Sequence, residues 1–177
     1  RFLSQFDLEI FDAELKPIHG GSCVAYIGHK GQRSYSNQFL HLQQKEIEDG
    51  IDKIEIYLGF HDTAERNKKK LIAMLSELKE SGLSVQALGA PVKGSTIINY
   101  CKLTTKDIDC GVEINPHKFN TCFPGTKIPV YDQSKTQEPN VYLLLAWNFK
   151  DEILYRLKDF RERGGKILVP IPEPEII

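Results

Sequence analysis

Hydrophobic and polar residues repeat with short periods in the N-terminal part of the chain. Residues 6–15 alternate between apolar and acidic side chains with one break in phase, and residues 22–28 form a second run rich in β-forming residues. A short loop with glycines joins the two runs, which is the pattern of an antiparallel β-hairpin. Residues 37–50 then carry apolar side chains at helical spacing, so a helix is predicted with Ser36 as N-cap and Gly50 as C-cap.

The next apolar pattern, over residues 51–60, allows two interpretations. Its alternating aliphatic side chains suit a strand, whereas a short helix between two helices fits equally well. A long helix with an apolar face is predicted to begin at Asp62 or Thr63 and to end at Gly82. We therefore expect a mainly helical segment over residues 36–83.

Strands and helices alternate from residue 84 to the end of the chain. The expected strands cover residues 84–88, 108–114, 127–130, 141–145 and 166–171, and the expected helices cover residues 94–103 and 149–163. This order predicts an α/β fold with a Rossmann-like, mostly parallel sheet, flanking helices and right-handed crossovers. The hairpin (residues 1–35) and the helical segment (residues 36–83) would precede this Rossmann-like domain (residues 84–177).

Composition narrows the class of protein. Hydrophobic residues make up 41 % of the chain, which is enough for a core, and the net charge of −1 gives no argument for nucleic acid. No apolar run approaches the ~20 residues of a membrane span, and no signal peptide is visible. The four cysteines lack the spacing of a zinc site or of a disulfide framework. We expect a cytoplasmic protein with free thiols, no bound metal, and neither nucleic acid nor membrane as a partner.

Residues 84–96 read as a buried strand, a glycine-containing turn that includes Gly89, and the start of a helix. Backbone N–H groups at a helix start lack partners, and the helix dipole adds partial positive charge there. Lys93 would add a point charge, and Ser95 and Thr96 would add hydroxyl donors. The segment predicts a site for a phosphate-bearing ligand, although it is neither GxGxxG nor a P-loop. A tight strand-to-helix turn with an N-cap is the alternative.

Two further strand ends carry polar or aromatic side chains. Glu113 and Asn115 follow one strand, where they would contact a ribose hydroxyl or cap a turn before proline. Trp147 and Asn148 follow another strand. Trp147 would either stack on a sugar or base or pack in the core, and Asn148 would either contact a ligand or cap a helix. Residues 117–118 are expected on an exposed loop. No spacing in the sequence identifies a catalytic nucleophile.

Five segments, taken in order, resemble the sugar C-methyltransferases that act on nucleotide-linked deoxysugars. They are PIHGGS (residues 17–22), LGAPVKGSTIINYC (88–101), NPHK (115–118), PGTKIPV (124–130) and LLAWNF (144–149). The resemblance spans nearly the whole chain. It implies a three-part enzyme with a zinc-binding N-terminal module, a central S-adenosylmethionine domain and a Rossmann-like C-terminal domain that helps to hold the sugar nucleotide.

The resemblance implies that this chain carries the C-terminal domain and the final hairpin of the methyl-donor domain. The zinc module, the S-adenosylmethionine motif and the catalytic segment of the family would lie in missing N-terminal parts of the enzyme. No residue of this chain is therefore assigned as catalytic, and we expect the chain to be inactive alone. Ser95 stands where many relatives are expected to have Asn.

The expected function is the binding of a nucleotide-diphosphate sugar, a dTDP-linked keto-deoxysugar, in position for methyl transfer. The expected substrate-binding residues are His19, Gly89, Ala90, Lys93, Gly94, Ser95, Thr96, Asn99 and Asn115. Two alternatives remain: a non-catalytic Rossmann-like module that binds a nucleotide or a protein, and a fragment of an NAD-dependent oxidoreductase. The missing GxGxxG motif disfavours the oxidoreductase.

Overall fold

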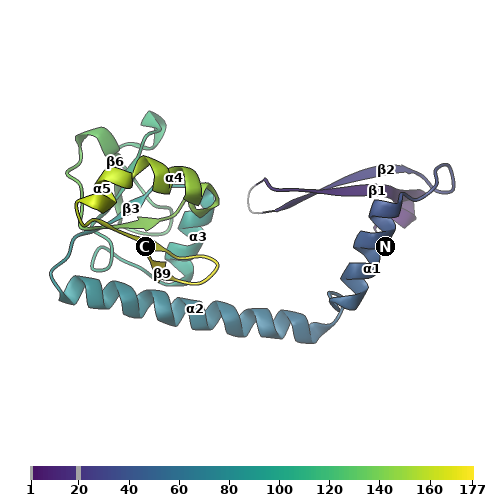
Figure 1. Ribbon diagram of the computed structural model, residues 1–177, viewed down its shortest axis with the longest axis horizontal. Coiled ribbons are helices and arrows are strands. Elements are labelled where there is room, and N and C mark those ends of the chain that lie inside the picture. Colours follow the sequence, from purple (N-terminus) through teal and green to yellow (C-terminus); the bar gives the residue numbers. More distant parts are fainter. Residues whose placement is uncertain (1, 19–20) are drawn as a thin grey trace. The chain divides into compact units, whose positions relative to one another are not determined.

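The computed structural model describes residues 2–18 and 21–177 (Figure 1). The chain divides into two compact units, Arg1–His61 and Asp62–Ile177. In the first unit, strands β1 (Leu8–Lys16) and β2 (Ser22–His29) form the predicted antiparallel hairpin after a short 3₁₀ turn, η1 (Leu3–Phe6). A register shift in β1 accounts for the break in the alternating pattern, because a bulge turns the following side chains to the other face.

Helix α1 (Asn37–Glu48) has the predicted N-cap, whereas its C-cap is Asp49, one residue before the predicted Gly50. The Ser36 hydroxyl accepts a hydrogen bond from the Phe39 amide at 3.0 Å. At the other end Gly50 adopts a positive φ of 67°, and its amide donates to the Ile47 carbonyl. This left-handed residue closes the helix because glycine has no Cβ to oppose that conformation.

Helix α2 (Ile54–Glu80) is longer than predicted. It begins at Ile54 rather than at Asp62 or Thr63, so the strand interpretation of residues 51–60 is wrong. The aliphatic side chains that suggested a strand are exposed, and their alternation therefore does not mark a buried face. A helix satisfies its own backbone hydrogen bonds, whereas a strand here would need a partner. The second unit begins within α2.

The second unit contains the predicted mostly parallel sheet, with strand order β5-β6-β4-β3-β7-β8-β9. The four inner contacts, β6–β4, β4–β3, β3–β7 and β7–β8, are parallel, and the short edge strands β5 and β9 pair antiparallel. The strands are β3 (Val85–Leu88), β4 (Cys110–Glu113), β5 (Thr121–Cys122), β6 (Pro129–Asp132), β7 (Val141–Leu144), β8 (Lys166–Val169) and β9 (Glu175–Ile176).

Helices cover both faces of this sheet and bury two apolar clusters against it. The C-terminal part of α2 and helix α3 (Val92–Tyr100) pack on one face, and helices α4 (Lys150–Arg156) and α5 (Lys158–Glu162) pack on the other. The single helix predicted over residues 149–163 is therefore wrong. The backbone leaves helical geometry at Leu157, where no glycine or proline marks the break.

Strand β3 is the point where the strand order reverses. The chain passes from β3 through α3 to β4 on one side, and β7 lies against the other side of β3. In an open α/β sheet this reversal opens a crevice outside the carboxyl ends of the central strands. A ligand site is therefore expected beside Leu88, where β3 ends.

Candidate functional site

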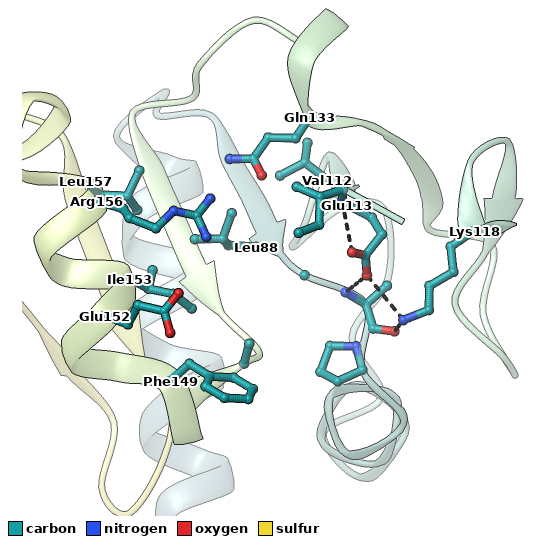
Figure 2. Close-up of a pocket in the computed structure, with 15 residues that line it drawn as sticks. Leu88, Val112, Glu113, Lys118, Gln133, Phe149, Glu152, Ile153, Arg156 and Leu157 are labelled. Carbon is teal, nitrogen blue, oxygen red and sulfur yellow. Dashed lines mark hydrogen bonds and ion pairs between the residues drawn. The ribbon is translucent and has the colours of Figure 1, made fainter. Parts of the chain in front are cut away.

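A pocket of about 310 Å³ lies at the carboxyl ends of β3, β4 and β7, with α4 on its other side (Figure 2). We call it the switch-point pocket. Its apolar walls are formed chiefly by Leu88, Val112, Phe149, Ile153 and Leu157, and its polar lining by Glu113, Lys118, Gln133, Glu152 and Arg156. A mainly apolar cavity with a few convergent polar groups is typical of sites for small organic ligands.

A second pocket, of about 460 Å³, runs along the side of α3, and we call it the α3 pocket. Helix α3 contributes Val92, Ser95, Thr96 and Asn99, and the segment from His117 to Pro124 contributes the opposite side. Ala90 and Lys118 line both pockets. The two pockets are thus neighbours, joined at the turn between β3 and α3.

The turn between the pockets has the geometry of an anion site. Gly89 has a positive φ of 80°, and its amide donates to the Val112 carbonyl at 2.8 Å. The amides of Gly94 and Ser95 donate to the Pro91 carbonyl. Among the described residues, no acceptor is found for the amides of Val92 and Lys93. The first turn of α3 therefore offers two backbone donors at the positive end of the helix dipole.

Glu113 holds this turn in place from inside the sheet. Its side chain is buried, with 9 % of the residue exposed, and accepts hydrogen bonds from the amides of Ala90 (3.0 Å), Ile114 (2.9 Å) and Asn115 (3.2 Å). Lys118 Nζ donates to the same carboxylate at 3.2 Å and to the Ala90 carbonyl at 3.0 Å. We call this arrangement the Glu113 brace.

The Glu113 carboxyl of the brace is ionised at neutral pH. Burial alone would raise the pKa of the Glu113 carboxyl, but the amide hydrogen bonds and the Lys118 ammonium outweigh burial and hold the pKa below its ordinary value. The carboxylate oxygens are already used by these donors. Glu113 therefore acts on the turn at Ala90 in this structure, rather than presenting a free carboxylate to a ribose. Lys118 was expected on an exposed loop, and its role in the brace could not be predicted because it depends on a contact made across the turn.

The residues predicted to bind substrate fall into separate groups. Gly89 lines the switch-point pocket, Ala90 lines both pockets, and Ser95, Thr96 and Asn99 line the α3 pocket. Ser95 and Thr96 were expected at a helix start. They lie one turn inside α3, because the helix begins at Val92 with Pro91 as its N-cap. Both residues therefore line the α3 pocket instead of facing the first helical amides, and the Thr96 hydroxyl donates to the Val92 carbonyl at 3.5 Å.

Three of the remaining predicted residues, Lys93, Gly94 and Asn115, lie outside the pocket linings. The Lys93 ammonium lies 5.3 Å from the ring centroid of Trp147, in a cation–π contact. Gly94 is buried, and a Cβ there would come within 2.9 Å of Leu145, so close helix–strand packing requires glycine at this position. Asn115 accepts a hydrogen bond from the His117 amide and caps the 3₁₀ turn η2 (Pro116–Lys118). His19 lies outside the described residues.

Asn99 ties α3 to the loop that closes the α3 pocket. Its Nδ2 donates to the carbonyls of Ser95 and Pro124, both at 2.8 Å. Gly125, with a φ of 79°, approaches the Asn99 amide so closely that a Cβ on Gly125 would overlap with it. The glycine and the asparagine therefore fix the pocket wall together.

The described part of the chain offers neither a cluster of metal ligands nor a membrane-spanning helix. Within residues 2–18 and 21–177, His, Cys, Asp and Glu side chains form no group of three or more that could hold a metal ion. Over the same ranges, no helix combines the length and apolar character needed to cross a membrane. The four cysteines are free, and Cys101 and Cys110 are buried.

The chain is similar in sequence to known C-methyltransferases. Residues 17–172 match the family described as the C-methyltransferase C-terminal domain, and the chain belongs to this family. The chain is also 31 % identical over 173 residues to C-methyltransferase NovU of Streptomyces niveus. This match covers 96 % of the chain but 41 % of the relative, so the chain spans less than half of that protein. The family predicted from the five ordered segments is confirmed.

Proposed function

We propose that this chain is the substrate-binding C-terminal domain of an S-adenosylmethionine-dependent C-methyltransferase that acts on a dTDP-linked keto-deoxysugar. One observation carries the proposal: in a member of this family, two amides of α3 without an acceptor among the described residues lie beside two pockets that share Ala90. An extended ligand with a central anion matches that arrangement. A sugar nucleotide is such a ligand, with its diphosphate between the base and the sugar.

The diphosphate would bind at the start of α3. The amides of Val92 and Lys93 would donate to its oxygens, and the dipole of the helix favours negative charge there by about 0.3–1 kcal/mol. The Lys93 ammonium, held over Trp147, would turn from the ring toward the phosphate and supply a full charge. The Glu113 brace keeps Ala90, and therefore the start of the helix, in position.

The sugar would lie in the α3 pocket. Ser95 and Thr96 bring hydroxyl groups to this pocket, and Asn99 brings its amide oxygen. Hydroxyl groups both donate and accept, which suits the hydroxyl and keto oxygens of a deoxysugar. Specific hydrogen bonds here would orient the sugar relative to the rest of the enzyme.

The role of the domain would be positioning rather than chemistry. S-adenosylmethionine would supply the methyl group, and a base elsewhere in the enzyme would remove the proton beside the keto group. Holding a substrate in a reactive geometry lowers the activation free energy by several kcal/mol, on the order of 7 or more in favourable cases. This chain would contribute by fixing the sugar carbon, and we expect no methyl transfer by the chain alone.

S-adenosylmethionine does not fit this chain well. The turn after β3 reads Gly89-Ala90-Pro91, without the further glycines of a dinucleotide-type loop. The carboxylate at the end of β4, where such cofactors place a ribose, is already bound by the Glu113 brace. We therefore place the methyl donor, and any zinc module, in parts of the enzyme outside this chain.

The N-terminal hairpin would belong to the methyl-donor domain, with residues 36–83 as the connection. A two-stranded hairpin is at best marginally stable alone. Several apolar side chains of β1 and β2, including Leu15 and Ile27, are exposed, which suits strands that complete a larger sheet. The free thiols of all four cysteines favour a reducing, cytoplasmic location.

Titration of the chain with three ligands tests the proposal. A dTDP-linked sugar, NAD and S-adenosylmethionine would each be added while thermal unfolding and heat of binding are followed. A ligand at ~100 times its dissociation constant stabilises the folded state by about 2.7 kcal/mol. We expect this shift with the dTDP-sugar alone. Stabilisation by NAD alone, or by none of the three, would contradict the proposal and favour the oxidoreductase or the non-catalytic module, respectively.

A further inference from the structure

The switch-point pocket contains two polar side chains that the fold does not use. Gln133 reaches it from the 3₁₀ turn η3 (Gln133–Lys135), and Arg156 reaches it from α4 (Figure 2). Within the described residues, neither side chain has a hydrogen bond or an ion pair. Glu152 lies one turn before Arg156 on α4 without forming an ion pair within 4.0 Å. These donors and acceptors are therefore available to a ligand.

The walls between these two side chains suit a flat, apolar group. Leu88 and Val112 come from adjacent strands, and Ile153 and Leu157 come from α4. The ring of Phe149 lies at the edge of the pocket and is half exposed, so it is free to stack (Figure 2). A planar heterocycle would bury both faces here while its polar edge meets Gln133 and Arg156.

The side chains that line the pocket give it no net positive charge to attract an anion. Glu113 and Glu152 bring two carboxylates, and these offset the charges of Lys118 and Arg156. The unpartnered amides that suit a diphosphate lie outside it, at Val92 and Lys93. The group that enters the switch-point pocket is therefore a neutral part of the ligand, next to the anion.

We propose that the switch-point pocket binds the pyrimidine base of the nucleotide, and that Gln133 and Arg156 read its carbonyl–NH–carbonyl edge. This inference rests on the proposed function. A glutamine amide both donates and accepts, so it can pair with an N–H and a carbonyl together. A guanidinium only donates, so Arg156 favours a carbonyl and disfavours the amino group of cytosine.

The path between the pockets fits this assignment. Ala90 and Lys118 line both pockets, and the start of α3 lies between the two. A nucleotide sugar would thus extend from the switch-point pocket, across the amides of Val92 and Lys93, into the α3 pocket. The base, the diphosphate and the sugar each meet groups of matching chemistry.

The test measures binding of thymidine diphosphate, cytidine diphosphate and inorganic pyrophosphate to the 177-residue chain by calorimetry. The variants are Gln133→Leu and Arg156→Gln, with Arg161→Gln as a matched control on α5 outside the pocket. Each of the two pocket variants should weaken thymidine diphosphate about tenfold or more, since a hydrogen bond from a buried polar edge is lost. In both pocket variants the preference for thymidine diphosphate over cytidine diphosphate should also fall, while the affinity for pyrophosphate stays unchanged. The control variant Arg161→Gln should bind all three ligands as the wild type does.

Three results would overturn the inference. If both pocket variants bind thymidine diphosphate as the wild type does, the base lies elsewhere and the proposed function is untouched. If Arg156→Gln weakens thymidine diphosphate and pyrophosphate equally, Arg156 acts through charge and does not read the base. If the wild-type chain binds no nucleotide, the proposed function fails first. Thermal unfolding of each variant separates a loss of binding from a loss of folding.

Discussion

Replacing Glu113 by Gln should destabilise the second unit and loosen the turn that carries the proposed anion site. The carboxylate accepts four hydrogen bonds, with Ala90 and Lys118 at one oxygen and Ile114 and Asn115 at the other. A glutamine can keep its oxygen on one pair, but its NH₂ group then faces donors on the other. The glutamine oxygen would most readily keep the hydrogen bonds from the backbone amides of Ile114 and Asn115, which are adjacent in sequence. The hydrogen bonds from Ala90 and Lys118 are then lost.

The size of the effect follows from those two contacts. The bond from the buried Ala90 amide to a charged acceptor is worth about 2 kcal/mol. The Lys118 bond is worth about 1 kcal/mol, because the side chain of Lys118 is 41 % exposed and water screens the pair. We expect Glu113→Gln to lower the free energy of unfolding by about 3 kcal/mol, which corresponds to a fall in melting temperature of roughly 10 °C for a domain of this size.

Urea unfolding at neutral pH measures this change, with Glu138→Gln as the matched control. Glu138 also forms an ion pair, with Arg163 at 2.6 Å, but both side chains are more than half exposed. An exposed pair contributes about 0–1 kcal/mol. A loss for Glu113→Gln no larger than for Glu138→Gln would refute the account of the brace, since Glu113 differs from Glu138 in its burial and in the backbone amides that it accepts from.

The pH dependence gives an independent check with a defined sign. The pKa of Glu113 is lowered on folding from an ordinary value of 4.5, so its contribution is present above that value and lost as the pH falls through the folded pKa. The difference in stability between wild type and Glu113→Gln should therefore be constant near pH 7 and shrink below about pH 4.5. A difference that grows on acidification would contradict the assigned direction.

Three other expectations concern residues of the site and the core. Lys93→Ala should change the fluorescence of Trp147, the single tryptophan, and weaken pyrophosphate binding about tenfold; unchanged emission and affinity would remove Lys93 from the anion site. Gly94→Ala should lower the free energy of unfolding by about 1–3 kcal/mol, because the new methyl group clashes with Leu145 and this outweighs the better helix propensity of alanine. A more stable variant would show that Leu145 moves to make room for the methyl group. Burial raises the pKa of the Cys101 thiol to about 11, so this thiol should react slowly with a thiol reagent at pH 8 until urea unfolds the chain. Rapid labelling of Cys101 in the native state, detected by mass spectrometry, would contradict the buried environment.

The α/β architecture could be predicted because the two central strands are short, buried runs bounded by turn residues. Residues 85–88 and 141–144 are buried at every position and, apart from Gln86, mostly apolar, which is the pattern of a parallel central strand. The start of α2 could not be predicted in the same way. Its first turns carry exposed aliphatic side chains, so their spacing does not reflect a buried face.

The candidate site was predictable where local backbone geometry defines it and not where distant side chains do. The turn after β3 could be identified from Gly89 and Lys93, because a strand, a glycine and a helix start lie together in the sequence. The Glu113 brace depends on Lys118 folding back to Ala90, and no period in the sequence encodes that contact. Gln133 and Arg156 are ordinary polar residues in the sequence and gain meaning from the pocket that they share.

The unused side chains of Gln133 and Arg156 have an evolutionary consequence. Substitutions at these two positions break no hydrogen bond of the fold among the described residues, whereas a change at Glu113 disturbs a buried network. Surface substitutions away from such networks usually alter stability by no more than about 0.5 kcal/mol. If Gln133 and Arg156 read the base as proposed, mutation at these two positions would change the preferred nucleotide, while selection for a folded domain acts on other residues.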